Sequence, residues 1–287
     1  MTVHHYAIAW NEARVLGFFF RHYDPVVDRY VIFDDGSTDG TLDMLRAHPK
    51  VELRRFKRSH PDSLVLSMLT IYNQAWKESR GKADWVFVSN IDEHLHHPRL
   101  ADYLAECRVD GVTAIPALGY QMLSERFPAP SATLSETVRQ GAADPGMSKL
   151  QIFDPNAIRE INYEPGRHRA RPRGRIRWPR RDELMNLHYK LLERDYVRQR
   201  HAAMRQGLGE TDLNRKLGTH YLWEADELDR FWDAYAGYTV DIGAPGFEPW
   251  NSHGERRWWR ERRIDRMARR LRQRWQRWMA RRAPEAL

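Results

Sequence analysis

The segment Arg29-Tyr-Val-Ile-Phe-Asp-Asp-Gly-Ser-Thr-Asp-Gly-Thr41 decides how the rest of the chain is interpreted. Its first half is a run of β-branched and aromatic residues that ends at an Asp-Gly pair, which is typical of a buried strand. Thr38 or Asp39 can then cap the N-terminus of a helix. A strand that passes through a tight acidic loop into a helix is the repeating unit of an α/β fold.

The same alternation runs through the first 120 residues. Strands are predicted at residues 3–9, 29–34, 51–56, 84–89 and 112–117. Helices are predicted at residues 11–23 and 62–79, where apolar residues recur at helical spacing. We therefore predict an α/β fold of open, mostly parallel sheet type with helices on both faces. Ligands bind such sheets beyond the carboxyl ends of the strands.

The second half of the chain has a weaker pattern. We predict a loop or lid at residues 124–148 and an irregular linker at residues 237–254, because both stretches are rich in turn-forming residues. Between them we predict strands at 149–153 and 184–192 and helices at 193–206 and 224–235. The expected organisation is a catalytic domain over 1–236, with a nucleotide-binding half (1–120) and an acceptor half (121–236), the linker, and a C-terminal helix over 255–287.

The net charge of +8 is concentrated at the C-terminus. Residues 255–287 hold thirteen Arg against four acidic residues, a local charge of +9, so the remaining 254 residues carry −1. A near-neutral body of this kind argues against a nucleic-acid-binding fold. The first residues lack the pattern of a signal peptide, and no stretch approaches the length of a membrane span. With Cys107 as the one cysteine, we expect a cytoplasmic protein without an intramolecular disulfide.

The basic tail has a helical pattern. An apolar stripe on an Arg-covered helix is formed by Ile264, Met267, Ala268, Leu271, Trp275 and Trp278. A cationic helix with Trp on its apolar face can lie in the interface of an anionic membrane, which predicts peripheral attachment through 255–282 at the inner face. Packing on the catalytic body, packing on a second subunit in an oligomer, and RNA binding stay open as alternatives.

Two acidic motifs follow predicted strands. Asp34 and Asp35 end the strand at 29–34, and Asp92 and Glu93 follow the strand at 84–89. Carboxylates at neighbouring strand ends can hold a divalent cation and the ribose of a nucleotide, and Mn²⁺ or Mg²⁺ shares such ligands with substrate phosphates. Either motif alone also fits a solvated turn. Their joint occurrence indicates a nucleotide site.

Three stretches together resemble the family-2-like glycosyltransferases of the GT-A fold. They are Asn11-Glu12, Val31-Ile-Phe-Asp-Asp-Gly-Ser-Thr-Asp-Gly-Thr41 and Trp85-Val-Phe-Val-Ser-Asn-Ile-Asp-Glu-His94. Further positions of one branch are matched by Met147-Ser-Lys149, Pro165-Gly-Arg-His168 and Asn186-Leu-His-Tyr-Lys190. The resemblance, over about residues 5–205, implies transfer of a sugar, with inversion, from a nucleotide-sugar donor. It implies a UDP-linked donor and a glycan, lipid-linked or other envelope acceptor.

The resemblance also implies roles for individual residues. The donor-binding set that it implies is Asn11, Glu12, Asp34, Asp35, Ser37, Asp39, Asn90 and Lys149, with Lys149 near the diphosphate. Asp92 and His188 are the expected ligands of Mn²⁺ or Mg²⁺. His168 and Glu93 are the candidates for the general base, His168 because an imidazole titrates near neutral pH. A purely structural role stays open for both histidines.

Asn90 departs from the family pattern, which has an aspartate there. An Asn side chain can accept a hydrogen bond from ribose but brings no charge, so the metal ion is either bound more weakly or dispensable unless Glu93 compensates. This departure keeps open a degenerate transferase that serves as a binding or scaffold protein. A nucleotidyltransferase is disfavoured, because the first loop, Trp10-Asn-Glu-Ala-Arg14, has no glycine. The eight Arg of 167–181 either clamp an anion or form a solvated loop.

Overall fold

The computed structural model describes residues 1–253 and 257–260 of the 287. The chain divides into a unit of Met1–His253 and a second unit of Gly254–Leu287. The apolar stripe predicted for the C-terminal helix lies outside the described residues. Among the described residues, no helix is both long and apolar enough to cross a membrane.

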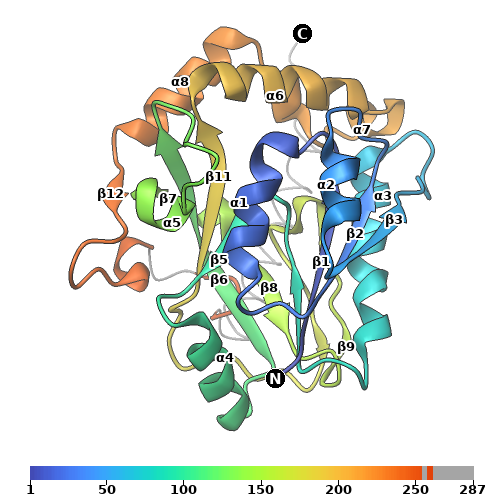
Figure 1. The fold of residues 1–287 in the computed structure, drawn as a ribbon, viewed down its shortest axis with the longest axis vertical. Helices are drawn as coiled ribbons and strands as arrows, with labels where there is room; N and C mark the ends of the chain where they lie inside the picture. Colours follow the sequence, from blue (N-terminus) through green and yellow to red (C-terminus); the bar gives the residue numbers. More distant parts are fainter. Residues whose placement is uncertain (254–256, 261–287) are drawn as a thin grey trace, which may run out of the picture. The chain divides into compact units, whose positions relative to one another are not determined.

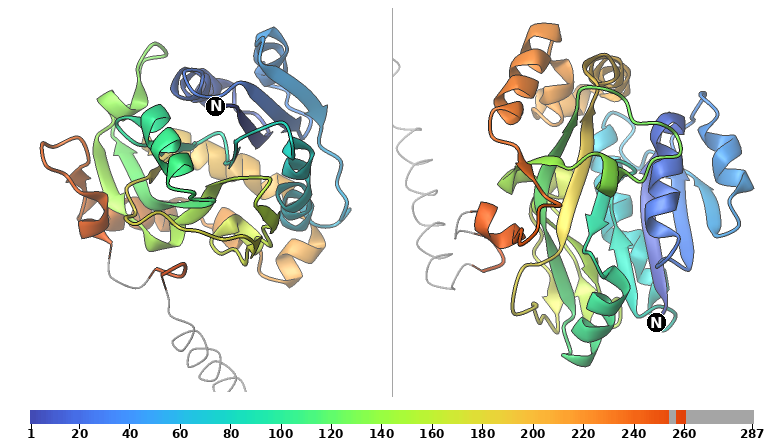
Figure 2. Two further views of the ribbon diagram at one scale, coloured as in Figure 1. Left: turned by 90° about the horizontal axis from the view of Figure 1, so that it is seen from below. Right: turned by 60° about the vertical axis from the view of Figure 1, so that its left-hand side comes forward.

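Four parallel strands form the first half of the sheet, in the order β4-β1-β2-β3. They are β1 (Val3–Ala9), β2 (Arg29–Asp34), β3 (Val51–Arg55) and β4 (Trp85–Val88). The connecting helices are α1 (Ala13–Tyr23), α2 (Thr41–Ala47), and α3 (Leu64–Gln74) with the 3-10 turn η1 (Ala75–Ser79). Right-handed crossovers place α1 and α2 on one face of the sheet and α3 on the other (Figures 1 and 2).

The chain order along the sheet reverses at β1, whose neighbours are β2 and β4. Connections from neighbouring strands leave in opposite directions at such a point, which opens a crevice at the carboxyl ends of the strands. The loops after β1, β2 and β4 all reach this crevice. These are the three loops that carry the sequence motifs.

The second half of the sheet is mixed. Its strands are β5 (Glu93–His96), β6 (Ala114–Ser124), β7 (Gln140–Ala143), β8 (Lys149–Phe153), β11 (Met185–Leu192) and β12 (Val240–Asp241). β8 joins the halves because it pairs antiparallel with both β4 and β6. β11 pairs parallel with β6 and antiparallel with β5. A separate two-stranded sheet is formed by β9 (Ile158–Glu160) and β10 (Arg173–Gly174).

Helices close the second half. They are α4 (Leu100–Val109), α5 (Leu134–Thr137), α6 (Arg194–Gly207), α7 (Glu210–Asn214) and α8 (Ala225–Ala236). The 3-10 turns are η2 (Pro145–Met147), η3 (Pro165–Arg167), η4 (Thr219–Leu222) and η5 (Pro249–Ser252). α6 and α8 pack on β6, β7 and β11 through a core of Leu123, Ala142, Leu191, Val197, Leu228 and Trp232. In Figure 1 they cover the upper end of the sheet.

The prediction of an open α/β sheet with helices on both faces is confirmed. All seven residues of β1 and all four of β4 are buried, because helices cover both faces of these strands. Parallel pairing dominates the first half, while the pairs made by β5, β7, β8 and β12 are antiparallel. The sequence pattern did not predict α4, β5 or β7. In α4 only Tyr103, Leu104 and Cys107 are buried, too few for a clear helical pattern.

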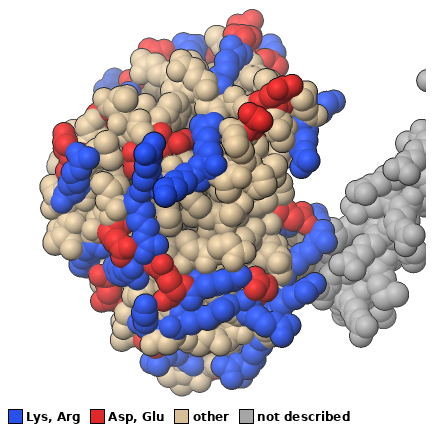
Figure 3. Space-filling view, turned by 90° about the vertical axis from the view of Figure 1, so that its right-hand side faces the viewer, with Lys and Arg blue, Asp and Glu red and all other residues tan. Residues whose placement is uncertain are grey.

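Residues 237–253, expected as a linker, belong to the first unit. β12 pairs with β7, and Tyr120 donates a hydrogen bond to the carbonyl oxygen of Pro249. His253 is buried and its Nε2 lies 2.9 Å from the carbonyl oxygen of Gly119. This segment therefore packs on the sheet. On the face drawn in Figure 3, basic and acidic side chains are interleaved, in agreement with the near-neutral charge of the body.

Candidate functional site

The loops after β1 and β2 are joined by hydrogen bonds. Asn11 has a left-handed backbone (φ 54°), and its side-chain Oδ1 accepts a hydrogen bond from the Thr38 amide at 2.8 Å. Its own amide donates to Ser37 Oγ at 2.9 Å. One residue further along the first loop, the Glu12 amide donates a hydrogen bond to Thr41 Oγ1 at 2.8 Å. The two loops therefore form one rigid rim of the crevice.

Asp34 shapes this rim instead of facing it. Its carboxylate accepts hydrogen bonds from the amides of Gly36 and Ser37, both at 2.9 Å, and from Ser37 Oγ. The side chain is 5% exposed. Asp35 points elsewhere and accepts a hydrogen bond from Arg58 at 3.2 Å. Asp34 and Ser37, both expected in the donor-binding set, are thus committed to holding the turn.

Glu12, Asn11 and Asp39 line a small pocket of about 140 Å³ together with residues of α6. Arg200 of α6 donates hydrogen bonds to Glu12 and to the carbonyl oxygen of Trp10. Burial raises the pKa of Glu12 to about 8, and the Arg200 guanidinium opposes this rise. The charges of Asp92 and Asp39 also act on Glu12. This electrostatic coupling links the rim to the second acidic motif.

Glu93 lies at the centre of a buried polar cluster. Its carboxylate accepts hydrogen bonds from Lys149 (2.7 Å), Gln151 (2.7 Å) and Arg167 (2.8 Å), and it is fully buried. Burial alone would raise the pKa of Glu93, but the charges of Arg167 and Lys149 hold it well below its usual range. Such a carboxylate has neither the basicity nor the access of a general base, so the structure does not support that expectation for Glu93.

Lys149, expected near the diphosphate, is 3% exposed and gives its ammonium to Glu93. Asn90 also belongs to this cluster. Its Oδ1 accepts hydrogen bonds from Tyr72 (2.8 Å) and Arg167 (2.9 Å), while its Nδ2 donates to Glu93 at 3.3 Å. An aspartate at position 90 would place a second carboxylate beside Glu93. Asn90 is therefore held in the cluster by hydrogen bonds to Tyr72, Arg167 and Glu93.

Asp92 and His188 form the part of the site that suits a metal ion. His188 Nε2 lies 3.4 Å from Asp92 Oδ2, and ligand atoms of Asp92, Glu93 and His188 all lie within 4.8 Å of one another. The other oxygen, Asp92 Oδ1, is buried without a hydrogen-bond partner among the described residues. Because Glu93 already accepts hydrogen bonds from Lys149, Gln151, Arg167 and Asn90, Asp92 and His188 are the two that remain to hold a cation.

The orientation of His188 is set by the residues behind it. Gln121 Nε2 donates to Asp144 at 2.9 Å, which turns Gln121 Oε1 toward His188 Nδ1 at 2.9 Å. Tyr235 of α8 donates to the same carboxylate oxygen of Asp144. His188 Nδ1 then carries a hydrogen, and Nε2 faces Asp92 Oδ2 at 3.4 Å. In this orientation His188 and Asp92 can act together as ligands of a cation.

Lys190 supplies a cation beside this pair. It follows His188 by two residues on β11, where the pairing with β6 shifts register between His188 and Leu191. Its Nζ lies 5.3 Å from the ring centre of Tyr221 and 5.7 Å from that of Phe231. Burial lowers the pKa of Lys190 to about 8, opposed by the charge of Asp92. Lys190 forms no ion pair with any residue that the structure describes.

His168, a candidate base, lies at the edge of the cluster. Its Nδ1 is 2.6 Å from the carbonyl oxygen of Gly146, so Nδ1 carries the hydrogen and Nε2 is the atom that can accept a proton. Partial burial of the ring, together with the charge of Lys149, lowers the pKa of His168 to about 4. The ring is therefore neutral at pH 7 and a weaker base than an ordinary histidine.

Charge interactions thus connect Glu12 with Asp39 and Asp92, and Asp92 lies beside His188, while Glu93, Asn90 and Lys149 belong to the buried cluster. Four residues of the site had no role assigned from the sequence. They are Arg167, Arg200, Gln121 and Lys190. Arg167 was one of eight arginines in the 167–181 segment, and nothing in that run distinguishes it from its exposed neighbours.

No protein-family model and no curated protein matches the chain. Among solved structures it is similar to TarS of S. aureus in complex with UDP-GlcNAc, with 14% identity, coverage of 54% of this chain and 46% of that chain, and a TM-score of 0.34. It is similar to glucosyl-3-phosphoglycerate synthase from Mycobacterium tuberculosis in complex with Mn²⁺, UDP and glucosyl-3-phosphoglycerate, with 18% identity, coverage of 42% and 44%, and a TM-score of 0.29. The matched part spans less than half of either of those chains.

Proposed function

We propose that this protein is a glycosyltransferase that uses a nucleotide-sugar donor. The observation that carries the proposal is the pair of Asp92 and His188 in the crevice at the topological switch point. Asp92 Oδ1 has no hydrogen-bond partner among the described residues, and His188 Nε2 lies 3.4 Å from Asp92 Oδ2. A cation that also binds a diphosphate would satisfy both.

Two parts of the site would bind the two parts of the donor. The rim would bind the nucleoside, and the region of Asp92 would bind the diphosphate. The pocket of Asn11, Glu12 and Asp39 suits the hydroxyl-rich nucleoside, because carboxylates and amide oxygens accept hydrogen bonds from ribose. The diphosphate would lie between Asp92 and Lys190. Lys190 is the cation best placed for it, because Lys149 and Arg167 already bind Glu93. We propose UDP as the nucleotide, on the resemblance of the motifs.

Mn²⁺ or Mg²⁺ is the proposed cofactor. When bound, a divalent ion stabilises the negative charge that develops on the departing diphosphate. The chain's own contribution is to hold Asp92 and His188 in place. Gln121, Asp144 and Tyr235 fix the His188 ring from behind, and the buried cluster of Glu93 holds the turn that carries Asp92.

His168 is the proposed base for an inverting transfer, with Nε2 as the proton-accepting atom. Gly146 O holds its Nδ1–H, which sets the tautomer. The acceptor is proposed to be a glycan, a lipid-linked saccharide or another envelope component. Attachment to the inner face of the membrane through 255–282 stays a prediction, because those residues lie outside the described part of the chain apart from 257–260.

The test is transfer or hydrolysis of UDP-sugars by the full chain and by Asp92→Ala. We expect Asp92→Ala to lose activity while its melting temperature stays near that of the wild type, because Asp92 Oδ1 has no partner to lose. Asp43→Ala is the matched control, since Asp43 is an exposed acid on α2 with an 87% exposed side chain. Full activity in Asp92→Ala would refute the site.

A binding or scaffold protein is the second candidate. The observation that favours it is the small number of protein ligands, because Glu93 is neutralised by Lys149 and Arg167 and position 90 is Asn. The two candidates differ in turnover. A protein that binds UDP in a thermal-shift assay but neither transfers nor hydrolyses any UDP-sugar, with or without Mn²⁺, would be the scaffold.

A further inference from the structure

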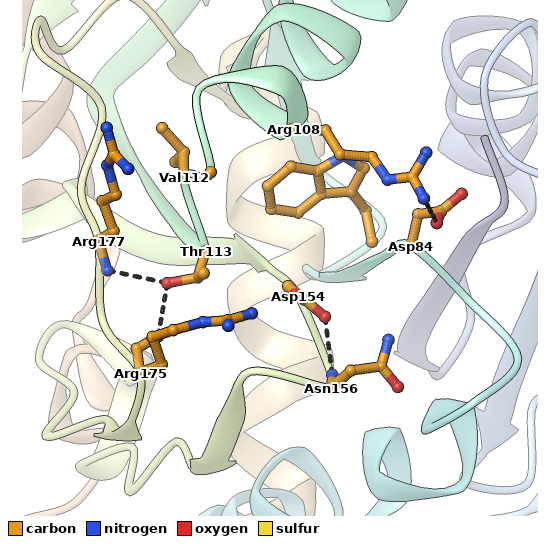
Figure 4. Close-up of a pocket in the computed structure, with 10 residues that line it drawn as sticks. Asp84, Arg108, Val112, Thr113, Asp154, Asn156, Arg175 and Arg177 are labelled. Atoms are coloured by element: carbon orange, nitrogen blue, oxygen red, sulfur yellow. Dashed lines mark hydrogen bonds and ion pairs between the residues drawn. The ribbon is translucent and has the colours of Figure 1, made fainter.

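A second pocket lies at the opposite end of the sheet from the candidate donor site. It has a volume of about 430 Å³, within the range of small-molecule sites. It is bounded by residues just before β4 and β6, just after β8, and at the end of α4 (Figure 4). The four residues of β4 separate it from the loop that carries Asp92, a distance of about 13 Å at the rise of a strand. No residue of the donor site lines it.

Three arginines from separate segments line this pocket. Arg108 ends α4, while Arg175 and Arg177 lie on the segment that follows β10. Of the two aspartates on the wall, Asp84 binds Arg108 at 2.8 Å and also accepts a hydrogen bond from the Thr2 amide at 2.7 Å. Asp154 accepts a hydrogen bond from the Asn156 amide at 2.8 Å. The lining thus carries three positive and two negative side chains.

Arg175 and Arg177 form no ion pair with any residue in the described part of the chain. Neither points back at Asp84, whose carboxylate is taken by Arg108 (Figure 4). The Arg-rich segment was expected either to clamp an anion or to be a solvated loop. At these two positions the side chains line a hollow of molecular size, which a solvated loop does not require.

The backbone that carries the two arginines is fixed by Thr113. Thr113 Oγ1 donates to the carbonyl oxygen of Arg175 at 2.7 Å and accepts from the amide of Arg177 at 2.8 Å. The Thr113 amide donates to the carbonyl oxygen of Arg177 at 2.9 Å. Gly111 has a left-handed backbone, and a side chain there would come within 3.2 Å of Arg177 Nη1. The backbone of the segment that carries the two arginines is therefore held in place by Thr113.

We propose that this pocket binds a small phosphate-bearing molecule through Arg175 and Arg177. A guanidinium group binds phosphate with two parallel hydrogen bonds, and Arg175 and Arg177 each bring to this pocket a guanidinium group without an ion-pair partner among the described residues. The indole of Trp85 forms part of the wall, and its Nε1 has no acceptor among the described residues. The polar lining and its volume suit a phosphorylated metabolite better than an apolar ligand.

The experiment is isothermal titration of the full chain with two probes, inorganic phosphate and glucose 6-phosphate. We expect saturable binding in the wild type and in Asp92→Ala, because the donor site is separate. Tighter binding of glucose 6-phosphate than of phosphate identifies an organic phosphate as the ligand, and equal binding identifies the phosphate group alone. The double variant R175A/R177A should bind at least about tenfold more weakly, since each charge-assisted contact is lost.

The matched control is R169A/R173A. It removes the same charge from exposed arginines of the same segment that do not line the pocket, so it should bind like the wild type. R175K/R177K keeps the charge but not the fork of donors and should lose affinity several-fold. The proposal is overturned if the wild type binds neither probe, if both Ala pairs weaken binding equally, if R175K/R177K binds like the wild type, or if Asp92→Ala abolishes binding.

Discussion

Replacing Arg167 by Met tests whether the buried cluster supports the candidate site. Arg167 donates hydrogen bonds to Val88 O (2.8 Å), Asn90 Oδ1 (2.9 Å) and Glu93 Oε2 (2.8 Å) and is 2% exposed. Methionine fills a similar volume but cannot form any of these three hydrogen bonds. Removing one partner of a buried ion pair destabilises a protein by roughly 3–5 kcal/mol. Because Lys149 still neutralises part of the Glu93 charge, we expect a loss of about 3 kcal/mol, at the lower end of that range.

The assay is thermal or urea unfolding of Arg167→Met beside Arg169→Met. Arg169 is exposed two residues further along the chain, so its replacement should change stability by no more than about 0.5 kcal/mol. For a domain of this size, about 3 kcal/mol corresponds to a fall in melting temperature of roughly 6–12 °C. If Arg167→Met were as stable as Arg169→Met, Arg167 would not hold the cluster together. A loss of UDP binding at unchanged stability would instead make Arg167 a direct ligand of the diphosphate.

Two further predictions concern metal binding and pH. Gln121→Leu removes the acceptor that sets the tautomer of His188; we expect the affinity for Mn²⁺, measured by titration, to fall about 10–100-fold, and an unchanged affinity would exclude this role. Burial lowers the pKa of His22 and of His96 to about 4, whereas both titrate near 6.5 in the unfolded chain. The unfolded chain therefore binds more protons between these values, and stability should fall as the pH falls below 6.5. A melting temperature that stays constant from pH 7 to pH 5 would contradict this.

Much of the fold could be predicted from local pattern. The strands of the first half are continuous apolar runs because both faces are covered, and such runs stand out from the turns that bound them. β5, with the sequence Glu93-His-Leu-His96, was not predicted. His94 is buried against His22, whose ring stacks on it, and Tyr189, whose ring meets it edge-on, and both residues are distant in the sequence. No local pattern reports such contacts.

The candidate site was likewise predicted only in part from the sequence. The sequence indicated which loops carry the chemistry, because acidic residues directly after strands meet at one edge of a parallel sheet. It did not indicate what each side chain does there. Asp34 and Glu93 both belong to the motifs, yet one holds a turn and the other is neutralised by two cations. Which carboxylates stay open to a ligand depends on partners that come from distant segments.

The amino-acid sequence by itself determined the α/β class and the position of Asp92 and Glu93 directly after a strand. These follow from hydrophobic period and from turn chemistry, which act over a few neighbouring residues. Only the tertiary structure decided that Arg167 and Lys149 bind Glu93, that Gln121 orients His188, and that Arg175 and Arg177 face a pocket. Those outcomes depend on the burial and pairing of charges, and a charge is paired by whichever residue the fold brings within reach, at any distance along the chain.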